Sequence, residues 1–298
     1  MGGRIIGWII RAFFLFILVS ILWVLLYRFV PPPITFTQMG DLLGGRGVEK
    51  EWMPLSEIDN DMERAAIAAE DGKFCAHNGF DTDAIAAAMR SNAEGKKKIR
   101  GGSTISQQTA KNAFLWQGGG YFRKGLEAWF TLLIEQMWTK QRIMEVYLNI
   151  AETGIGTYGV NAGAQRYFGK DASNLTRQEA ARIAAVLPLP KEREAVAPSG
   201  FTRRYGNSIA SRIRVVQRDG LDACLRGEDA TPAAEPEERA APAKKKKAES
   251  KAAPAPEKAE DYIDPADIAP AAVEPEAEKA TPPAPEQEPT ALQDLNGM

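Results

Sequence analysis

An uninterrupted apolar run lies near the N-terminus of the chain. Residues 12–27 (AFFLFILVSILWVLLY) carry no charge, and Arg11 and Arg28 bracket them. A helix that crosses a membrane needs about 20 apolar residues. The apolar residues that flank the run supply this length if one arginine snorkels. The pattern therefore predicts a transmembrane anchor over residues 12–30.

Charges beside this run predict the orientation of the anchor. Arg4 and Arg11 precede it, so residues 1–11 should stay in the cytoplasm and the rest of the chain should be exported. In a bacterium this gives a single-pass inner-membrane protein whose body lies in the periplasm. The alternative is a cleaved signal peptide, but no small-x-small cleavage site follows, and Pro31–Pro33 stiffens the exit instead.

Beyond the anchor, apolar residues recur at helical spacing over residues 61–227, and almost no stretch alternates as a strand does. Thr104 with Gln107, and Thr176 with Glu179, match the spacing of helix-capping boxes. No internal repeat occurs. The expected fold class is mainly α, in one domain large enough for a single core. Helices are predicted over residues 62–70, 83–93, 103–114, 123–147, 175–187 and 201–218.

The segments on either side of this domain differ from it in composition. Residues 31–60 contain Pro54 and several glycines and are predicted to be an extended linker. Residues 228–298 hold 17 acidic and 8 basic residues, 12 of the 19 prolines and one aromatic residue. Such a segment cannot bury enough apolar surface to fold, so a disordered tail is predicted. The overall charge of −2 is thus the sum of +7 over residues 1–227 and −9 over the tail.

The chain has two cysteines, Cys75 and Cys224, and one histidine, His77. This composition excludes a disulfide-dense scaffold and a Cys/His zinc site, and it is not that of a collagen-like or multi-span membrane protein. Two exported cysteines are free to pair. A lone buried thiol at Cys75 fits the sequence equally well, so the pairing stays open.

The first candidate for chemistry is the segment EDGKFCAHNGFD, residues 70–81. Glu70 and Asp71 end an apolar, alanine-rich helix, and Phe74 and His77 follow in a polar and aromatic loop. A carboxylate that emerges from an apolar helix is a candidate for a raised pKa, which a general base needs. The alternative is a helix end that carries ordinary solvated acids.

Glu127 is the second candidate carboxylate. Phe130 and Ile134 share its helical face, so the acid lies on an apolar stripe and is either paired or functional. Arg123, one turn earlier, offers a pairing without any function. Glu152 is a further acid that precedes a glycine-rich turn, and it ranks lower than Glu70 and Glu127.

The segment GGSTISQQTAKN, residues 101–112, combines anion-binding and sugar-binding groups. Ser103 and Thr104 open a helix, and backbone N–H groups at a helix start suit anions. Amide side chains suit sugar hydroxyls and a lysine suits phosphate, although the same residues fit a solvated polar face. Two pairs share a face through four-residue spacing: Gln107 with Lys111, and Gln108 with Asn112.

Taken together, these segments resemble family 51 glycosyltransferases, the peptidoglycan glycosyltransferases. The resemblance covers about residues 60–220. Five motifs in the family's order make the match specific, although each alone is weak. The absence of Ser-x-x-Lys and Lys-Thr-Gly motifs indicates the monofunctional class, without a transpeptidase module. The matching pieces are residues 70–81, 101–112, 123–127 (RKGLE), 140–149 (KQRIMEVYLN) and 157–190.

The resemblance implies a two-lobed, lysozyme-like helical fold and polymerisation of lipid II, with a lipid-linked glycan as donor. It implies Glu70 as general base on the acceptor hydroxyl, and Glu127 near the leaving pyrophosphate. Four cations would neutralise phosphate: Lys111, Arg123, Lys124 and Lys140. Further substrate contacts would come from Asp71, Phe74, His77, Ser103, Thr104, Gln107, Gln108 and Asn112.

One position departs from the family pattern. Many relatives carry an arginine four residues before the Arg123–Lys124 pair, where this chain has Gly119. Phosphate neutralisation should then depend more on Lys111 and Arg123. The resemblance requires no cofactor, and it leaves open whether a divalent cation bridges the pyrophosphate. Expected partners are the membrane, lipid II and other cell-wall synthesis proteins, but not nucleic acid.

Two other functions fit parts of this pattern. A lysozyme-like lytic enzyme would share the helical fold and a catalytic glutamate, but it would not need the basic cluster or the anchor. An inactive, membrane-anchored assembly protein would account for Gly119.

Overall fold

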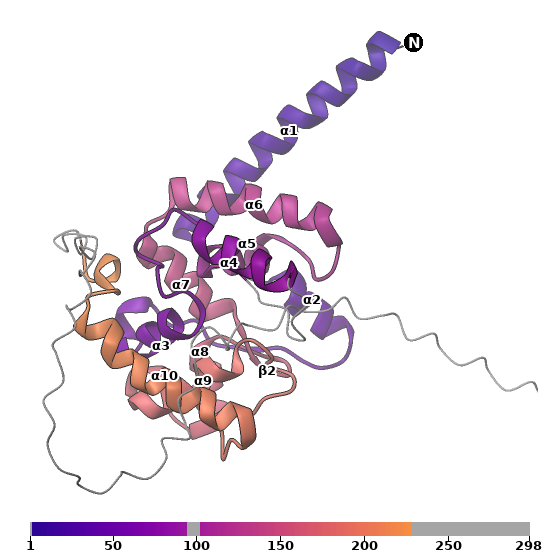
Figure 1. Cartoon of the computed structure of the whole chain (residues 1–298). Coiled ribbons are helices and arrows are strands. Elements are labelled where there is room, and N and C mark those ends of the chain that lie inside the picture. The colour runs from indigo at the N-terminus through magenta and orange to yellow at the C-terminus, as the bar shows by residue number, and fades with distance from the viewer. Residues whose placement is uncertain (1, 94–101, 228–298) are drawn as a thin grey trace, which may run out of the picture.

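The N-terminal helix extends beyond the predicted span toward the N-terminus. The computed structural model describes residues 2–93 and 102–227. Helix α1 (Gly2–Phe29) contains a 26-residue apolar stretch, Arg4–Phe29, in which an 18-residue window has a mean hydropathy of 2.7, and little of that window is buried. Figure 1 shows α1 projecting from the body as an isolated rod. It is the one helix among the described residues that is long and apolar enough to cross a membrane, as the predicted anchor requires.

The last turns of α1 are packed into the body. The Trp138 indole N–H donates to the Val24 carbonyl over 2.9 Å, and the Arg142 guanidinium donates to the Tyr27 carbonyl over 2.8 Å. Val24 is completely buried. Carbonyls near the end of α1 therefore bind side chains of the body, which fixes the body against the end of the apolar helix.

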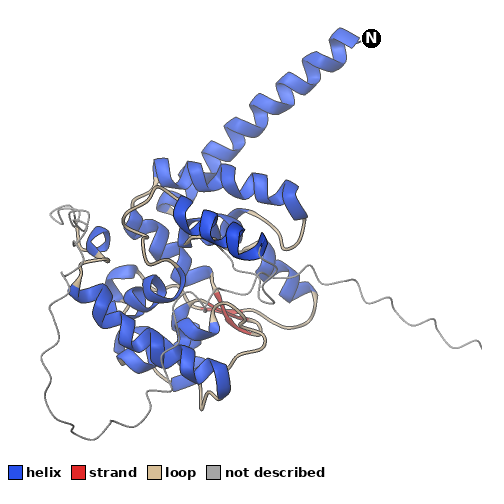
Figure 2. Cartoon of the chain, in the orientation of Figure 1, coloured by secondary structure: helices blue, strands red, loops and turns tan. Residues whose placement is uncertain are grey.

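The body is mainly helical, as predicted (Figure 2). Both predicted capping boxes are present, at Thr104 and at Thr176. The helical run predicted over 123–147 is two helices, because the Thr139 side chain accepts the Arg142 N–H and starts a new one. The helices that match the sequence pattern are α3 (Asn60–Glu70), α4 (Thr82–Ala93), α5 (Ile105–Phe114), α6 (Gly120–Met137), α7 (Lys140–Ile150), α9 (Arg177–Val186) and α10 (Gly200–Arg218).

The segment 31–60 differs from the extended linker that its composition suggests. A capping box of Thr35 and Gln38 starts helix α2 (Phe36–Leu43) inside it. The sequence pattern also missed helix α8 (Val160–Phe168), which follows a turn rich in glycine. A small sheet in the order β1-β3-β2 was missed as well, since its strands are too short to show alternation. These are β1 (Glu49–Lys50), β2 (Glu152–Gly154) and β3 (Thr157–Tyr158), with β1 parallel and β2 antiparallel to β3.

Two helical layers meet at the end of α3. Helix α10 packs on α9 and α3, while α5 packs on α6 and α7, with α1 against α6 (Figure 1). One hydrophobic core joins both layers. The chain leaves α3 at Glu70 and reaches the start of α5 at Thr104, so the first two motifs lie where the layers join.

The two cysteines, whose pairing the sequence left open, form a disulfide. Cys75 is bonded to Cys224, which lies in a short 3₁₀ helix after α10 (Ala223–Leu225). Arg226 in the same segment pairs with buried Glu63 of α3 at 2.9 Å. The C-terminal part of the domain is therefore fastened both to α3 and to the loop that follows it. The tail predicted over 228–298 lies outside the described residues.

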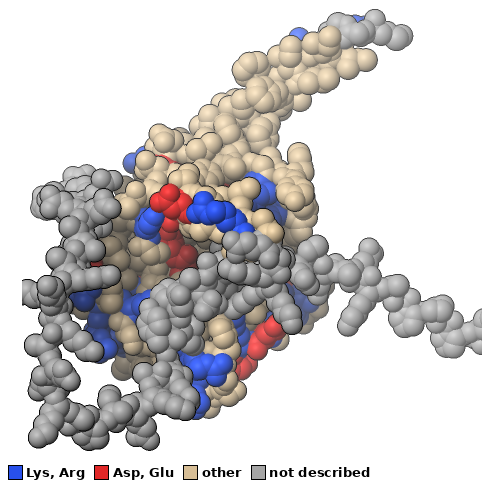
Figure 3. Space-filling view, in the orientation of Figure 1, with Lys and Arg blue, Asp and Glu red and all other residues tan. Residues whose placement is uncertain are grey.

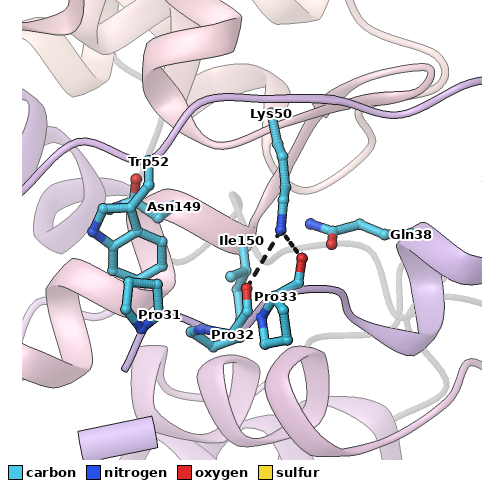
Figure 4. A pocket seen from close by; sticks show the side chains of 8 residues that line it. All are labelled: Pro31, Pro32, Pro33, Gln38, Lys50, Trp52, Asn149 and Ile150. Carbon is cyan, nitrogen blue, oxygen red and sulfur yellow. Dashed lines mark hydrogen bonds between the residues drawn. The ribbon is translucent and has the colours of Figure 1, made fainter. Parts of the chain in front are cut away.

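A cavity of about 140 Å³ lies where the chain leaves α1. Figure 4 shows Pro31–Pro33 on one side, Trp52 and Asn149 on another, and the Lys50 ammonium donating to proline carbonyls. The Asn149 side chain is bonded to Met53 and the α7 backbone. This corner holds the exit of the anchor on the body.

Candidate active site

Glu70, the last residue of α3, has a carboxylate with one partner. Its Oε2 accepts a hydrogen bond from the Gln108 amide over 2.8 Å. Its Oε1 is buried and has no partner among the residues that the structure describes. Burial raises the pKa of the Glu70 carboxyl, while the Gln108 hydrogen bond and the charges of Arg193 and Lys111 oppose the rise. An unpaired oxygen on a carboxylate with a raised pKa suits a general base.

The neighbouring carboxylate, Asp71, is engaged within the protein. Its Oδ2 accepts the backbone N–H of Ile105 at the start of α5 over 3.0 Å, and His77 Nε2 lies 2.9 Å from Oδ1. Gly79 N–H donates to His77 Nδ1 over 3.2 Å, so the ring proton of His77 is on Nε2, which donates to Asp71. The Thr104 hydroxyl donates to the Gly79 carbonyl over 2.7 Å. Asp71, His77 and Thr104 therefore fix the loop after Glu70 onto α5.

Three other residues that were expected to contact the substrate also make contacts within the protein. They are Gln107, Phe74 and Lys140. The Gln107 side chain accepts the Thr104 N–H over 3.1 Å as part of the capping box. Phe74 is completely buried, with the Lys140 ammonium 4.5 Å from its ring centre. Lys140 pairs with Glu135 at 2.8 Å. The Lys140 ammonium also donates to the His77 carbonyl over 2.7 Å, so Lys140 supports the loop that carries Phe74.

Glu127 is buried and paired on both oxygens. Arg123 Nη1 lies 2.8 Å from Oε2, and the Lys124 ammonium contacts Oε1. Lys124 also donates to the Ser103 hydroxyl over 3.1 Å, which joins this cluster to the segment before α5. Glu127 therefore holds two cations in place, as its helical spacing to Arg123 suggested.

The charges of both carboxylates, Glu70 and Glu127, act on the ammonium of Lys111. The residue as a whole is half-buried, and its ammonium makes no hydrogen bond or ion pair with any residue that the structure describes. Burial lowers the pKa of Lys111, the charges of Arg123 and Lys124 lower it further, and Glu127 and Glu70 oppose this. A buried cation without a partner is costly, so this site is suited to an anion from a substrate. Asn112 follows Lys111 on α5 and is half-buried.

Charged side chains gather on the face drawn in Figure 3. Acidic groups lie near the middle of this face, with Lys and Arg side chains on either side of them.

Gly119 occupies a backbone conformation that disfavours an arginine. Its φ of 88° lies in the left-handed region, and a Cβ there would approach Arg123 Cβ to 2.9 Å and Trp116 Nε1 to 3.0 Å. The Arg123 guanidinium donates to the Gly118 carbonyl and so closes this turn. An arginine in place of Gly119 would therefore strain this turn.

Two residues near Glu70, Arg193 and Tyr205, were not indicated by any pattern in the sequence. Arg193 comes from the segment between α9 and α10, and Tyr205 of α10 donates to the Ala69 carbonyl over 3.0 Å. Both are more than 120 positions away in sequence, and no motif marks either one. The packing of α9 and α10 on α3 brings them to the site.

The charges that act on Glu152 are different from those that act on Glu70 and Glu127. Burial raises the pKa of Glu152 to about 7, with Lys191 opposing and Asp41 adding to the rise.

Within residues 2–93 and 102–227, no group of three or more His, Cys, Asp or Glu side chains is arranged to hold a metal ion. Glu70, Lys111 and the Glu127 cluster therefore form the best candidate site.

The chain is similar to known proteins over most of its length. A profile described as Transglycosylase matches residues 37–214. Proteins named biosynthetic peptidoglycan transglycosylase from Caulobacter vibrioides and Bdellovibrio bacteriovorus are 48% and 46% identical to it. The alignments cover 74% and 73% of this chain and 97% and 89% of those relatives. One from Rhodospirillum centenum is 48% identical over 67% of this chain and 86% of its own length. The chain therefore belongs to the transglycosylase family.

Proposed function

We propose that this peptidoglycan glycosyltransferase polymerises lipid II with Glu70 as the general base and with Lys111 and the Glu127 cluster as the binding site for the donor pyrophosphate. Family membership already makes the chain an enzyme of glycan-strand synthesis in the cell wall. The observation that carries the assignment of roles is the contrast within the site. Glu70 has a free buried oxygen, Lys111 has no partner among the described residues, and Glu127 is saturated by cations.

The reaction transfers the growing glycan to a new acceptor. Glu70 takes the proton from the 4-hydroxyl of the N-acetylglucosamine of lipid II. The bond between this oxygen and C1 of the donor sugar forms as the bond from C1 to the phosphate oxygen breaks. The electron pair leaves with undecaprenyl pyrophosphate. Attack on the face opposite an α-linked leaving group gives a β-1,4 bond.

The cations stabilise charge on the leaving group. Pyrophosphate leaves readily, so a strong acid catalyst is less necessary than in glycoside hydrolysis. Positive charge aimed at the departing phosphate lowers the barrier instead. Lys111 supplies an unpaired ammonium, and Arg123 and Lys124 are held in position by Glu127.

The anchor supports access to a lipid-linked substrate. Trp138 and Arg142 hydrogen-bond the end of α1 to the body, which supports a site held close to the membrane that α1 would cross. We infer a single pass through the bacterial inner membrane, with the domain in the periplasm. Both donor and acceptor then diffuse within the same membrane.

The test is a lipid II assay with the purified full chain. Long glycan strands and released undecaprenyl pyrophosphate are expected. Parallel reactions with and without a chelator measure dependence on divalent cations. Cleavage of preformed sacculi without any polymerisation would contradict the proposal and would indicate a lytic enzyme.

A further inference from the structure

We infer that Arg193 is a positioning residue that keeps the Glu70 carboxylate ionised for proton transfer, an inference that rests on the proposed role of Glu70. Arg193 lies in the segment between α9 and α10, outside the motifs on which the family resemblance depends. It acts through Glu70 and needs no contact with substrate.

The guanidinium of Arg193 is held by three contacts. Its Nη1 donates to the Ala185 carbonyl near the end of α9 over 2.9 Å. Its central carbon lies 5.1 Å from the ring centre of Phe201 and 5.9 Å from that of Tyr205. Cation–π contacts of this length favour a fixed position for the charge. The half-buried side chain is therefore presented in one place rather than free in solvent.

The same tyrosine ties this charge to the end of α3. The Tyr205 hydroxyl donates to the carbonyl of Ala69, the residue before Glu70, over 3.0 Å. Tyr205 is buried, so the ring that carries Arg193 on its face is fixed relative to the base. The charge of Arg193 acts on the Glu70 carboxylate and favours its ionised form.

Arg193 is the cation that remains for Glu70 once substrate is bound. Lys111 also acts on Glu70, but in the proposed reaction its charge is shared with the donor pyrophosphate. Gln108 contributes a hydrogen bond and no charge. Burial, in contrast, drives Glu70 toward its protonated and inactive form. The groups that face Glu70 are Gln108 and Lys111 of α5, Asp71 of its own loop, Tyr147 of α7, Tyr205 of α10 and Arg193.

The expected effect has a defined sign. Removing a nearby positive charge raises the pKa of a carboxyl group. The base is then protonated up to a higher pH, so the acid limb of kcat/KM should move to higher pH by about one unit or more. The loss of rate should be large near pH 6 and shrink toward pH 9. A residue that only supports the fold would lower the rate by a similar factor at every pH.

The experiment compares pH profiles of lipid II polymerisation for three full-length variants. Arg193→Met removes the charge and Arg193→Lys retains it. Arg166→Met is the matched control, because Arg166 also bonds a backbone carbonyl, that of Ile155, and lies 5.8 Å from the Tyr167 ring. Circular dichroism and Tm of each variant establish that it folds. The acid limb should shift in Arg193→Met, return toward wild type in Arg193→Lys and stay in place in Arg166→Met.

Two results would overturn the inference. One is an unshifted acid limb in folded Arg193→Met, and the other is an equal shift in Arg193→Lys and Arg193→Met. Should Arg193→Met fail to fold, Arg193→Gln with the same profile serves in its place. Failure of the proposed function is distinguishable, because Glu70→Gln would then polymerise lipid II as wild type does.

Discussion

The two carboxylates of the site differ in how the protein surrounds them. Glu70 has one amide partner and a buried free oxygen, and burial raises its pKa. Glu127 is buried as well, but Arg123 and Lys124 occupy both of its oxygens. A carboxylate without a cationic partner is available to accept a proton, whereas one that bridges two cations serves to hold them.

This difference assigns separate tasks to two sides of one site. The side of α3 carries proton transfer, and the start of α6 carries charge for the leaving group. Lys111 on α5 lies between them electrostatically, since both Glu70 and Glu127 act on its pKa. The two sides should therefore respond differently when single residues are changed.

Removing the ionised carboxylate should have the largest effect. Glu70→Gln keeps the size of the side chain and abolishes the base, so the rate of lipid II polymerisation should fall by at least about 10²-fold. Tm should change little or rise, because a buried charge is removed. A polymerisation rate equal to that of wild type would show that Glu70 is not the base.

Lys111→Met should lower the polymerisation rate by about 10²-fold, because it deletes one group that stabilises charge in the transition state. The structure gives Lys111 no ion pair among the described residues, so the change breaks no internal contact of that kind. Because a buried cation without a partner is costly, urea unfolding should give a free energy of unfolding equal to that of wild type or higher. A folded variant with full activity would remove Lys111 from the pyrophosphate site.

Loss of the disulfide, which fastens the loop after Glu70, should lower the stability of the domain. Replacing Cys75 and Cys224 together by serine releases a crosslink between positions 149 apart. The free energy of unfolding should fall by about 2–4 kcal/mol. Urea titration of the double variant measures this fall, and reduced wild type should match the variant. An unchanged midpoint in both would mean that the link constrains little.

Deleting residues 228–298 should have the smallest effect. The acidic tail is predicted from its composition to be disordered. Its net negative charge is repelled by an anionic membrane. We expect it to act as a spacer or a partner-binding arm, so polymerisation of lipid II should be nearly intact without it. A large loss of activity would place the tail in the function of the site.

The sequence predicted the parts of the molecule that are encoded locally. Most helices and both capping boxes follow from apolar spacing and from side chains within a few positions of one another, as with Thr104 and Gln107. The break in the long helix at Thr139 was missed, since the apolar spacing continues across it. The two-residue strand at Thr157 is likewise too short to show a pattern.

Contacts between distant segments could not be predicted in the same way. The spacing of Arg123 and Glu127 on one helix suggested their pairing, and the structure contains it. Lys140 pairs with Glu135, which lies on the preceding helix, and no motif indicated this pair. The charge of Arg193 acts on Glu70 because α9 and α10 pack on α3, which no local pattern encodes.

The most direct test of the division between the two carboxylates is chemical rescue. The measurement is the initial rate of lipid II polymerisation by Glu70→Ala and by Glu127→Ala, each with and without added sodium formate. A small carboxylate in the space opened at position 70 can accept the proton, so formate should restore part of the rate in Glu70→Ala and none in Glu127→Ala. Restoration in Glu127→Ala alone would contradict the account and would move the base to Glu127.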